Sequence, residues 1–483
     1  MAAGVRGRLP NECGQRSAVA ALLFCAALGV VAPRPLAAET MQSALAKAYQ
    51  NNPQLNAQRA IVRQADEGVP EALSGYRPTI SANATLGREY SSVTQTIPPG
   101  AISPKSPGIT FSDKGLTAPR SVGVTGTQIF FNGLQTANKV RKAESQISQA
   151  RETLRMMEAS VLLAAATVYM DVSRDSANLE VQQNNVRVLE RTLQDTQNRY
   201  KAGQVTPTDV AQAEAQLAAA QSTMHAAEAT LMTTRANYRR IIGVEPAALA
   251  PAAPVDRLSP STLNGAITLG IQQNPSVTAA LYGVDVAQLQ VKIAEGALWP
   301  TLTGQYAFQK QNEPQLLSPK LYTNEVMLNL SVPIYQGGAE YSAIRLDKET
   351  VDQERVTVDQ VRDQTRADVV QAWGQLQAAK AEIEAAMRQN DAAARALTGV
   401  RNEAMAGQRT TQDVLNAEQA LVNARQSLLV AQHDRVVASY GLLSAVGRLS
   451  ARDLGLPVPV YDPQVHYQQV RDSWIGMRTP SGQ

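Results

Sequence analysis

Cysteine is nearly absent from the 483-residue chain, which has only Cys13 and Cys25. Both lie in a leader in which arginines precede a short apolar run that ends in small residues, typical of a secretory signal peptide over residues 1–38 that is cut after Ala38. A run this short does not span a membrane, and the bulky Phe24 before Cys25 argues against lipidation at that cysteine. We therefore expect an exported chain with neither disulfides nor thiol chemistry.

A net charge is also missing. The chain has 45 Lys and Arg against 42 Asp and Glu, and the leader accounts for four arginines and one glutamate, which leaves 41 of each sign. Because no basic excess remains, a nucleic acid is not an expected partner.

Signatures of catalysis and of metal binding are missing as well. His225, His433 and His466 stand at non-equivalent positions without ligand spacing, and we expect them at the surface. There is no nucleophile motif, phosphate-binding glycine loop or paired-carboxylate motif. The sequence therefore predicts no enzyme activity, no metal and no cofactor.

Proline and glycine are absent from residues 134–201, where a single helix of roughly 100 Å is expected. Its apolar residues repeat every seven positions with one step of four, which is typical of a coiled coil with a stutter. The series is Val140, Ile147, Leu154, Val161, Val168, Val172, Leu179, Val186, Leu193 and Tyr200. We expect a return helix at 206–242, and a second pair at 338–405 and 410–446.

These two helix pairs belong to an internal duplication. Residues 43–55, SALAKAYQNNPQL, match residues 265–277, GAITLGIQQNPSV, at an offset of 222, and the offset becomes 204 from Phe131-Asn132-Gly133 onward. The first copy thus has 18 additional residues, which we place in an exposed loop at 97–108. The division is repeat 1 at 39–250, repeat 2 at 251–455 and a C-terminal tail at 456–483, which is expected to wrap the waist of the helices.

Before each long helix the period changes from seven to two, which predicts strands at 78–92 and 119–131 and again at 300–312 and 321–334. Segments of this length with one apolar face suit tilted strands that cross an outer membrane, although an amphipathic sheet packed on a core has the same alternation. Aromatic residues lie near the segment ends, as in an interfacial girdle. They are Tyr90, Phe130, Phe131, Trp299, Tyr322 and Tyr335.

Four strands cannot close a membrane barrel, for which about eight is the bacterial minimum. An open sheet edge in lipid would leave backbone groups unpaired. If the strands cross a membrane, the chain must oligomerise, and a homotrimer would supply about twelve strands.

The whole pattern resembles the TolC family of outer membrane channel-tunnels, over residues 39–455. The resemblance rests on RPTI at 77–80 and WPTL at 299–302, on PIYQGG at 333–338, and on GQRTTQDVLNAEQALVNARQSL at 407–428 with AVGRLSARDLGL at 445–456. It is closest to the subgroup paired with type I secretion. The resemblance implies an α+β membrane protein, a trimeric 12-stranded barrel continuous with a helical barrel. It also implies docking to a periplasmic adaptor (membrane fusion protein) and to an inner-membrane ABC or RND transporter.

The two tips between long and return helices repeat a sixteen-residue motif, AGQVTPTDVAQAEAQL at 202–217 and AGQRTTQDVLNAEQAL at 406–421. Gly203 and Gly407 suit the positive φ that ends a helix. Thr206 to Asp209 and Thr410 to Asp413 each read as a capping box. Helix capping is one explanation for both aspartates, and a role at a gate is the alternative.

The resemblance adds roles at the tips. It implies that Asp413 forms a carboxylate ring at a periplasmic constriction, in which neighbouring charges raise the pKa values, and that Arg409 and Asp209 tie neighbouring hairpins closed. Asn416 stands where some relatives have a second acidic ring, and Ala404 replaces an expected tyrosine. Thr208 completes the expected gate, and the expected docking residues are Ala202, Gly203, Gln204, Ala406, Gly407 and Gln408.

The sequence therefore predicts a passive outer membrane exit duct that partners open at its periplasmic tip, for type I secretion or multidrug efflux. The alternative is a pore-less periplasmic coiled-coil scaffold or adaptor. An adaptor would need one hairpin rather than two repeats with membrane-length strand pairs.

Overall fold

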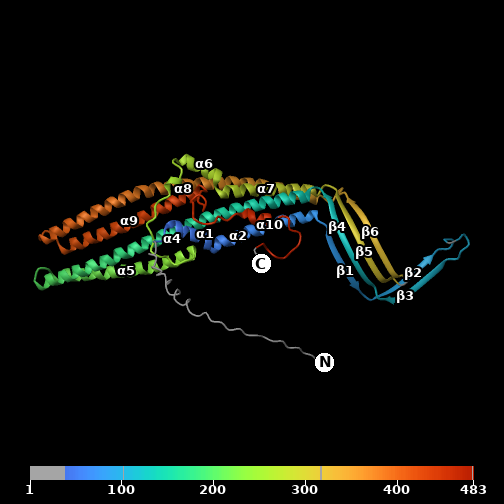
Figure 1. The fold of residues 1–483 in the computed structure, drawn as a ribbon, viewed down its shortest axis with the longest axis horizontal. Helices are drawn as coiled ribbons and strands as arrows, with labels where there is room; N and C mark the ends of the chain where they lie inside the picture. The colour runs from blue at the N-terminus through green and yellow to red at the C-terminus, as the bar shows by residue number, and fades with distance from the viewer. Residues whose placement is uncertain (1–37, 102, 316–317, 481, 483) are drawn as a thin grey trace, which may run out of the picture.

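The computed structural model describes residues 38–483 except 102, 316–317, 481 and 483, so the expected signal peptide lies outside the described residues apart from Ala38. The molecule is elongated (Figure 1). Helical hairpins form one end, antiparallel strands form the other, and short helices pack around the middle.

Four strands form one antiparallel sheet in the order β1-β4-β5-β6. They are β1 (Thr79–Leu86), β4 (Arg120–Asn132), β5 (Thr301–Gln315) and β6 (Ser318–Ser331). Each repeat thus contributes a pair of strands, and β4 joins β5 at the boundary between the repeats. Strands β1 and β6 are the two edges of this sheet.

The two faces of the sheet differ sharply in polarity. The register places even-numbered residues of all four strands on one face over most of its length, and this face is apolar and solvent-exposed in the single chain. It carries Ile80, Ala82, Ala84, Leu86, Val122, Val124, Tyr306, Phe308, Val326, Leu328 and Leu330. The other face carries Ser81, Asn83, Thr85, Thr125, Thr127, Gln305, Gln309 and Asn329. A sheet with this alternation suits a barrel wall between lipid and a watery lumen.

The prediction of one strand over 78–92 was wrong in its extent. Strand β1 ends at Leu86, and a separate two-stranded ribbon follows, with β2 (Glu89–Ile97) paired to β3 (Ile109–Thr117). The extra length of the first repeat is therefore a projecting ribbon rather than a loop alone (Figure 1), because alternating residues on both sides of the turn pair with each other. Tyr90, expected in an interfacial girdle, lies on this ribbon.

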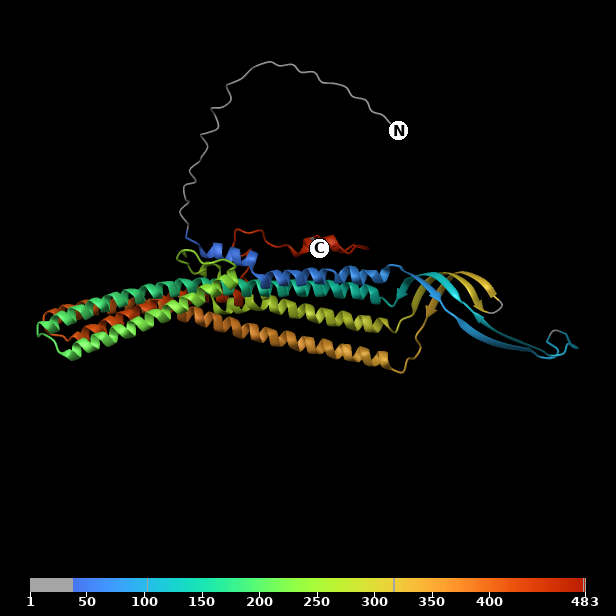
Figure 2. The same cartoon turned by 90° about the horizontal axis from the view of Figure 1, so that it is seen from below.

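The long helices are α4 (Gln135–Lys201) and α8 (Ala339–Met405), and their return helices are α5 (Pro207–Ile242) and α9 (Thr411–Ala445). Helices α2 (Pro53–Asp66) and α3 (Gly68–Leu73) in repeat 1 and α7 (Pro275–Gly296) in repeat 2 lie between the return helices and the sheet. Helices α1 (Met41–Asn51) and α6 (Leu263–Gln273) pack on the long helices at mid-length. Single 3₁₀ turns lie at Ser74–Tyr76 and Asp256–Leu258. Near the sheet, α2, α4, α7 and α8 lie side by side in that order (Figure 2).

Two equivalent asparagines join the return helices to these shorter ones. The side-chain oxygen of Asn52 accepts from the Gln54 N–H at 2.9 Å and begins α2, while its amide donates to the carbonyl of Ile241 near the end of α5 at 3.0 Å. Asn274 begins α7 and donates to the carbonyl of Ala445 in the same way. Each asparagine thus satisfies backbone groups at two helix ends that would otherwise be unpaired.

The main apolar core lies at mid-length, where α1 packs against α4 and α5, and α9 packs against α4. Tyr169 is fully buried there, and its hydroxyl donates to the carbonyls of Glu39 and Ala250 at 2.7 and 2.6 Å. Among the described residues, α4 is the one helix that is long and apolar enough to cross a membrane. Its apolar centre, with Leu162 and Ala165 fully buried, belongs to this core instead.

The tail does not wrap the waist in the way expected from the sequence. Helix α10 (Pro463–Val470) packs on α2, where His466 lies 2.9 Å from the buried Asp66. The chain then runs lengthwise toward the sheet, and Arg77, just before β1, donates to the carbonyl of Ser473 and lies over the ring of Trp474. The His466–Asp66 hydrogen bond on α2 and the contacts of Arg77 before β1 thus set the direction of the tail.

Candidate functional site at the helical tips

Both tips turn in the same way. Gly203 has a φ of 73° and Gly407 a φ of 75°, as predicted from the sequence. The next N–H, of Gln204 or Gln408, donates back to the carbonyl of Arg199 or Glu403 at 2.9 Å. This left-handed glycine closure satisfies the last carbonyls of each long helix and reverses the chain in a few residues.

Both predicted capping boxes are present. In the second tip, the Thr410 hydroxyl accepts from the Asp413 N–H, and the Asp413 carboxylate accepts from the Thr410 N–H at 2.9 Å. Thr206 and Asp209 repeat this geometry in the first tip, with Pro207 in the first helical turn. Capping therefore explains why both return helices begin where they do.

The capping bonds leave part of each carboxylate available. Only Oδ2 of Asp413 takes part in them, and Oδ1 has no hydrogen bond to any described residue. The N–H of Thr410, and then its hydroxyl, lower the pKa of Asp413, and Thr206 lowers the pKa of Asp209 similarly. The pKa increase expected for a carboxylate ring would come from the neighbouring Asp413 residues of other chains. Within one chain, the capping bonds lower the pKa of Asp413 and keep it ionised.

Arg409 does not reach Asp209 within the chain. Its Nε donates to Oε2 of Glu403 at 2.9 Å, in the same hairpin, and this pair raises the pKa of Arg409. Asn416, on the neighbouring turn, accepts from the amide of Gln412 at 3.0 Å. The expected Arg409–Asp209 latch is therefore not a contact inside one protomer.

The remaining predicted tip residues are exposed. Thr208 lies in the first turn of α5, and the expected docking residues lie at the outermost turns of the two hairpins. All of them are solvent-exposed in the single chain, namely Thr208, Ala202, Gly203, Gln204, Ala406, Gly407 and Gln408. The two tips are thus open to a partner.

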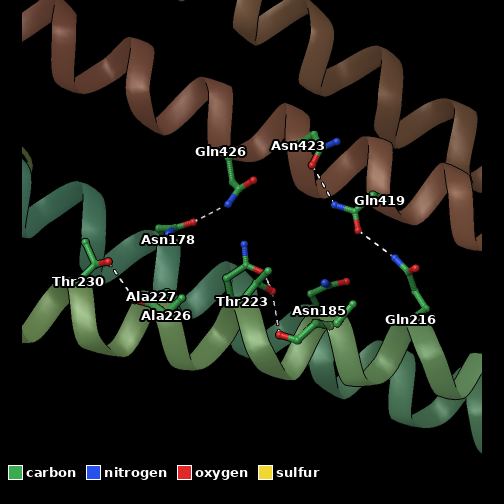
Figure 3. A pocket seen from close by; sticks show the side chains of 13 residues that line it. Asn178, Asn185, Gln216, Thr223, Ala226, Ala227, Thr230, Gln419, Asn423 and Gln426 are labelled. Atoms are coloured by element: carbon green, nitrogen blue, oxygen red, sulfur yellow. Dashed lines mark hydrogen bonds between the residues drawn. The ribbon is translucent and has the colours of Figure 1, made fainter.

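Amide side chains connect the two hairpins above the tips (Figure 3). Gln216 of α5 donates to Gln419 of α9 at 3.1 Å, and Gln426 of α9 donates to Asn178 of α4 at 3.1 Å. They lie along a polar cavity of about 450 Å³. The glutamine-rich faces were evident in the sequence, but these bridges were not predicted, because amide partners on different helices leave no local signal.

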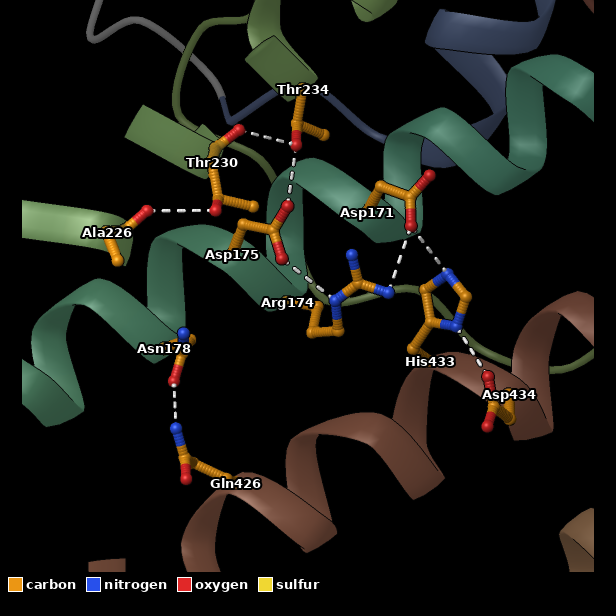
Figure 4. A network of polar contacts seen from close by, with 10 residues as sticks. All are labelled: Asp171, Arg174, Asp175, Asn178, Ala226, Thr230, Thr234, Gln426, His433 and Asp434. Carbon is orange, nitrogen blue, oxygen red and sulfur yellow. Dashed lines mark hydrogen bonds and ion pairs between the residues drawn. The ribbon is translucent and has the colours of Figure 1, made fainter. Parts of the chain in front are cut away.

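A charged network lies nearer mid-length (Figure 4). His433 of α9 is only 8 % exposed, so its expected surface position was wrong. Its Nδ1 lies 2.7 Å from Asp434 and its Nε2 lies 3.1 Å from Asp171 of α4, which also pairs with Arg174. The neighbouring Asp175 accepts from Arg174 and from Thr234 of α5. This network joins α4 to the return helices of both repeats.

We expect the heat stability of the protein to be greater at pH 6 than at pH 8.5. Burial lowers the pKa of His433, but Asp171 and Asp434 raise it more, so the folded pKa lies above the usual value of about 6.5. A histidine whose pKa is higher in the folded than in the unfolded protein stabilises the fold, and this stabilisation is complete below the unfolded-state pKa. It is lost as the pH rises through the folded-state pKa. The positive charge of Arg174 disfavours protonated His433 and so limits the rise in its pKa. Thermal unfolding followed by circular dichroism in detergent measures the difference.

His433→Gln should reduce this pH dependence, and the matched control His225→Gln should not, because the exposed His225 pairs with a single acidic residue among those described, Glu228 of its own helix. An unchanged pH dependence in His433→Gln would assign it to other groups.

A groove of about 740 Å³ lies between the ends of α4, α8 and α9. Its lining is strongly charged, and it includes Arg191, Asp195, Arg199, Arg401 and Glu418, with Gln204 and Ala404 at the tip side. The side chain of Glu418 is only 5 % exposed and lies 2.8 Å from Arg401. Its other oxygen is buried without a partner among the described residues, so one polar atom of the groove lining is unsatisfied.

Among the described residues, no group of three or more His, Asp or Glu side chains is arranged to hold a metal ion. The candidate functional features are therefore the exposed tips, the amide bridges between the hairpins and the charged groove, and none of them resembles a metal site.

Comparisons with known proteins agree with this geometry. The Outer membrane efflux protein family matches residues 44–244 and 266–448. The chain is 38 % identical to the outer membrane efflux protein BepC of Brucella suis, over 92 % of this chain and 93 % of BepC. It is 24 % identical to the alkaline protease secretion protein AprF of Pseudomonas aeruginosa, over 77 % of each chain. The solved CmeC outer membrane channel of Campylobacter jejuni superposes with a TM-score of 0.72 at 14 % identity, over 89 % of each chain.

The fold is that of a channel-tunnel protomer, and this chain belongs to the outer membrane efflux protein family. It resides in the outer membrane, extends into the periplasm and serves as an exit duct for export. The resemblance to the TolC family is confirmed. The alternative of a pore-less scaffold was wrong, since the family match spans both repeats, including the strands that such a scaffold does not need.

Proposed function

We propose that three copies of this chain form one passive duct, in which β1 of each copy pairs with β6 of the next. The single observation that carries this proposal is the open sheet, whose apolar face ends in two unpaired edges. Each unpaired backbone group in lipid costs several kcal/mol, so closure is strongly favoured. Three four-stranded sheets supply about twelve strands, which exceeds the bacterial minimum.

The closure is tested with paired cysteines, since the chain has no cysteine after Cys25. Ala82→Cys in β1 is combined in turn with Asn324→Cys, Val326→Cys or Leu328→Cys in β6. We expect one pair to give a covalent trimer on a non-reducing gel after oxidation of outer membranes. Monomers from all three pairs would contradict the trimer.

We further propose that the tips form the periplasmic gate. Asp413 and Asn416 line the constriction, with Thr208 beside them, and Arg409 and Asp209 bind between neighbouring protomers. Two observations support this arrangement: Oδ1 of Asp413 is uncommitted in the single chain, and the Arg409–Glu403 pair is exposed on both sides. An exposed pair stabilises by only about 0–1 kcal/mol, so Arg409 can exchange Glu403 for Asp209 at little cost. A gate held by weak pairs suits opening by a partner.

Asp413→Ala should weaken block of the channel by multivalent cations, because a ring of three carboxylates concentrates them. Single-channel recordings in a planar bilayer measure the block. The matched control is Thr410→Ala, which removes the side-chain cap of the same helix but keeps the carboxylate ring, and loss of an N-cap costs about 0.5–2 kcal/mol. If multivalent cations blocked both variants equally, Asp413 would only cap the helix and would not form the proposed ring.

The charged groove is proposed to receive the helical hairpin of a periplasmic adaptor, which links the duct to an inner-membrane ABC or RND transporter. The exposed tips, the partly unsatisfied Glu418 and the basic residues around it support such a partner. The names of BepC and AprF, an efflux protein and a protease secretion protein, support multidrug efflux and type I secretion as the two candidate routes. The duct itself performs no catalysis in this proposal.

Crosslinking in cells from a photoreactive residue at Gln204 or Gln408, both exposed, identifies the adaptor. Capture of an adaptor of an ABC exporter indicates secretion, and capture of an RND adaptor indicates efflux. Crosslinks to neither would contradict docking at the tips.

A further inference from the structure

The ribbon of β2 and β3 continues the pairing register of β1 and β4. Leu86 pairs with Arg120 and Glu89 pairs with Thr117, so the numbers of paired residues add up to 206 on both sides of the break. Between them the Gly87 N–H donates to the carbonyl of Pro119 at 3.0 Å, in the same phase. Odd-numbered residues of the ribbon are therefore on the same side of the ladder as odd-numbered residues of β1.

The polarity of the two sides changes within the ribbon, beyond its first pairs. In β1 and β4 the odd-numbered side is polar and the even-numbered side is apolar. In the ribbon, the even-numbered side keeps one apolar pair, Tyr90 with Leu116, and then carries Ser92, Lys114, Thr94, Ser112, Thr96 and Thr110. On the odd-numbered side, apolar residues gather toward the turn, where Val93 pairs with Asp113, Gln95 pairs with Phe111, and Ile97 pairs with Ile109.

This apolar side is uncovered in the single chain. Phe111 is 56 % exposed and Val93 is 53 % exposed, and the ribbon projects away from the sheet (Figure 1). A lone two-stranded ribbon is only marginally stable in water, so an apolar side at its outer end calls for a partner. The lipid bilayer does not fit, because this side continues the polar, lumen-facing side of the sheet beyond the membrane-spanning strands.

We infer that the odd-numbered apolar side of the ribbon, formed by Val93, Ile97, Ile109 and Phe111, packs against the same side of the ribbons of two further copies of this chain, as a second constriction over the extracellular mouth. The inference rests on the proposed trimer. Lumen-facing sides of three protomers point toward a common axis, so this side continues the barrel interior and meets its own copies there. The duct would then have an apolar closure outside and a polar gate at the periplasmic tips.

The test uses single cysteines in the otherwise cysteine-free exported chain. Phe111→Cys lies on the apolar side, and the adjacent Ser112→Cys lies on the opposite side as the matched control. Two sulfurs form a disulfide only when their Cβ atoms lie about 3.5–4.5 Å apart, so after oxidation of intact cells we expect at least about tenfold more disulfide-linked dimer from Phe111→Cys than from Ser112→Cys.

Equal yields from the two variants would overturn the inference. The β1–β6 cysteine pairs are oxidised in parallel to separate the two proposals. A β1–β6 crosslink without a Phe111 crosslink leaves the trimer intact and refutes the closure. Failure of both refutes the trimer, and the closure with it. In a planar bilayer, reduction of the Phe111→Cys disulfide should raise the conductance, and an unchanged conductance would show that the ribbons do not constrict the mouth.

Discussion

Val326→Arg is expected to prevent assembly of the protein in the outer membrane. Val326 lies midway along β6 on the apolar face of the sheet, opposite Tyr306, and is 80 % exposed in the single chain. An arginine on the lipid side costs about 2–4 kcal/mol near the bilayer midplane, which amounts to roughly 6–12 kcal/mol for three copies. The amount of heat-sensitive trimer in outer membrane fractions measures the loss.

The adjacent Met327→Arg provides the matched control. Met327 pairs with Gln305 on the polar face, where an arginine side chain meets the watery lumen. We expect this variant to assemble at close to the normal level and to change ion selectivity instead. If both arginines were tolerated equally, the assignment of the two faces would be wrong.

Gly133→Ala is expected to produce the second large effect. Gly133 has a φ of 64° at the junction of β4 and α4, and a Cβ there would lie 2.8 Å from the Cβ of Trp299 and against the backbone of Gly296. The left-handed conformation costs a non-glycine residue about 1–2 kcal/mol, and the overlap adds about 1–3 kcal/mol. We expect a clearly lower unfolding temperature and a reduced trimer yield.

The duplication supplies the control for this prediction. Gly337 is the equivalent residue in the second repeat, with a φ of 74°, and a Cβ added there would have no neighbouring atom within 4 Å among the described residues. Gly337→Ala should therefore show only the conformational part of the destabilisation. Equal destabilisation by the two substitutions would exclude packing against α7 as the cause.

The two equivalent glycines show how the halves of the protein diverged while the backbone was kept. Gly133 and Gly337 have the same conformation, yet only Gly133 is enclosed by the other repeat. The tips show the same divergence, because both keep the glycine closure and the capping box while only the second has the Arg409–Glu403 pair. We therefore expect gating to depend on the second tip more than on the first.

Local chemistry explains what could be predicted from the sequence. A capping box, a left-handed glycine and a seven-residue apolar repeat each act within a few residues, so Thr410 and Asp413 or Gly407 could be placed before the fold was known. Alternation in β1 likewise indicated which side chains share a face of the sheet. The duplication extended each of these inferences to a second position.

Contacts between distant segments could not be predicted in this way. His433 was expected at the surface, and only the packing of α9 on α4 brings Asp171 beside it and buries it. The amide bridge from Gln216 to Gln419 likewise depends on which faces of two hairpins meet.

The sequence by itself thus determined the duplicated architecture, the tips and the polarity of each strand, because short-range hydrogen bonding and periodicity encode them. Only the tertiary structure decided where β1 ends, how the additional residues of the first repeat continue as an in-phase ribbon, and which charges pair across the helices. Those features depend on register and on the meeting of helix faces, which residues far apart in the chain settle together.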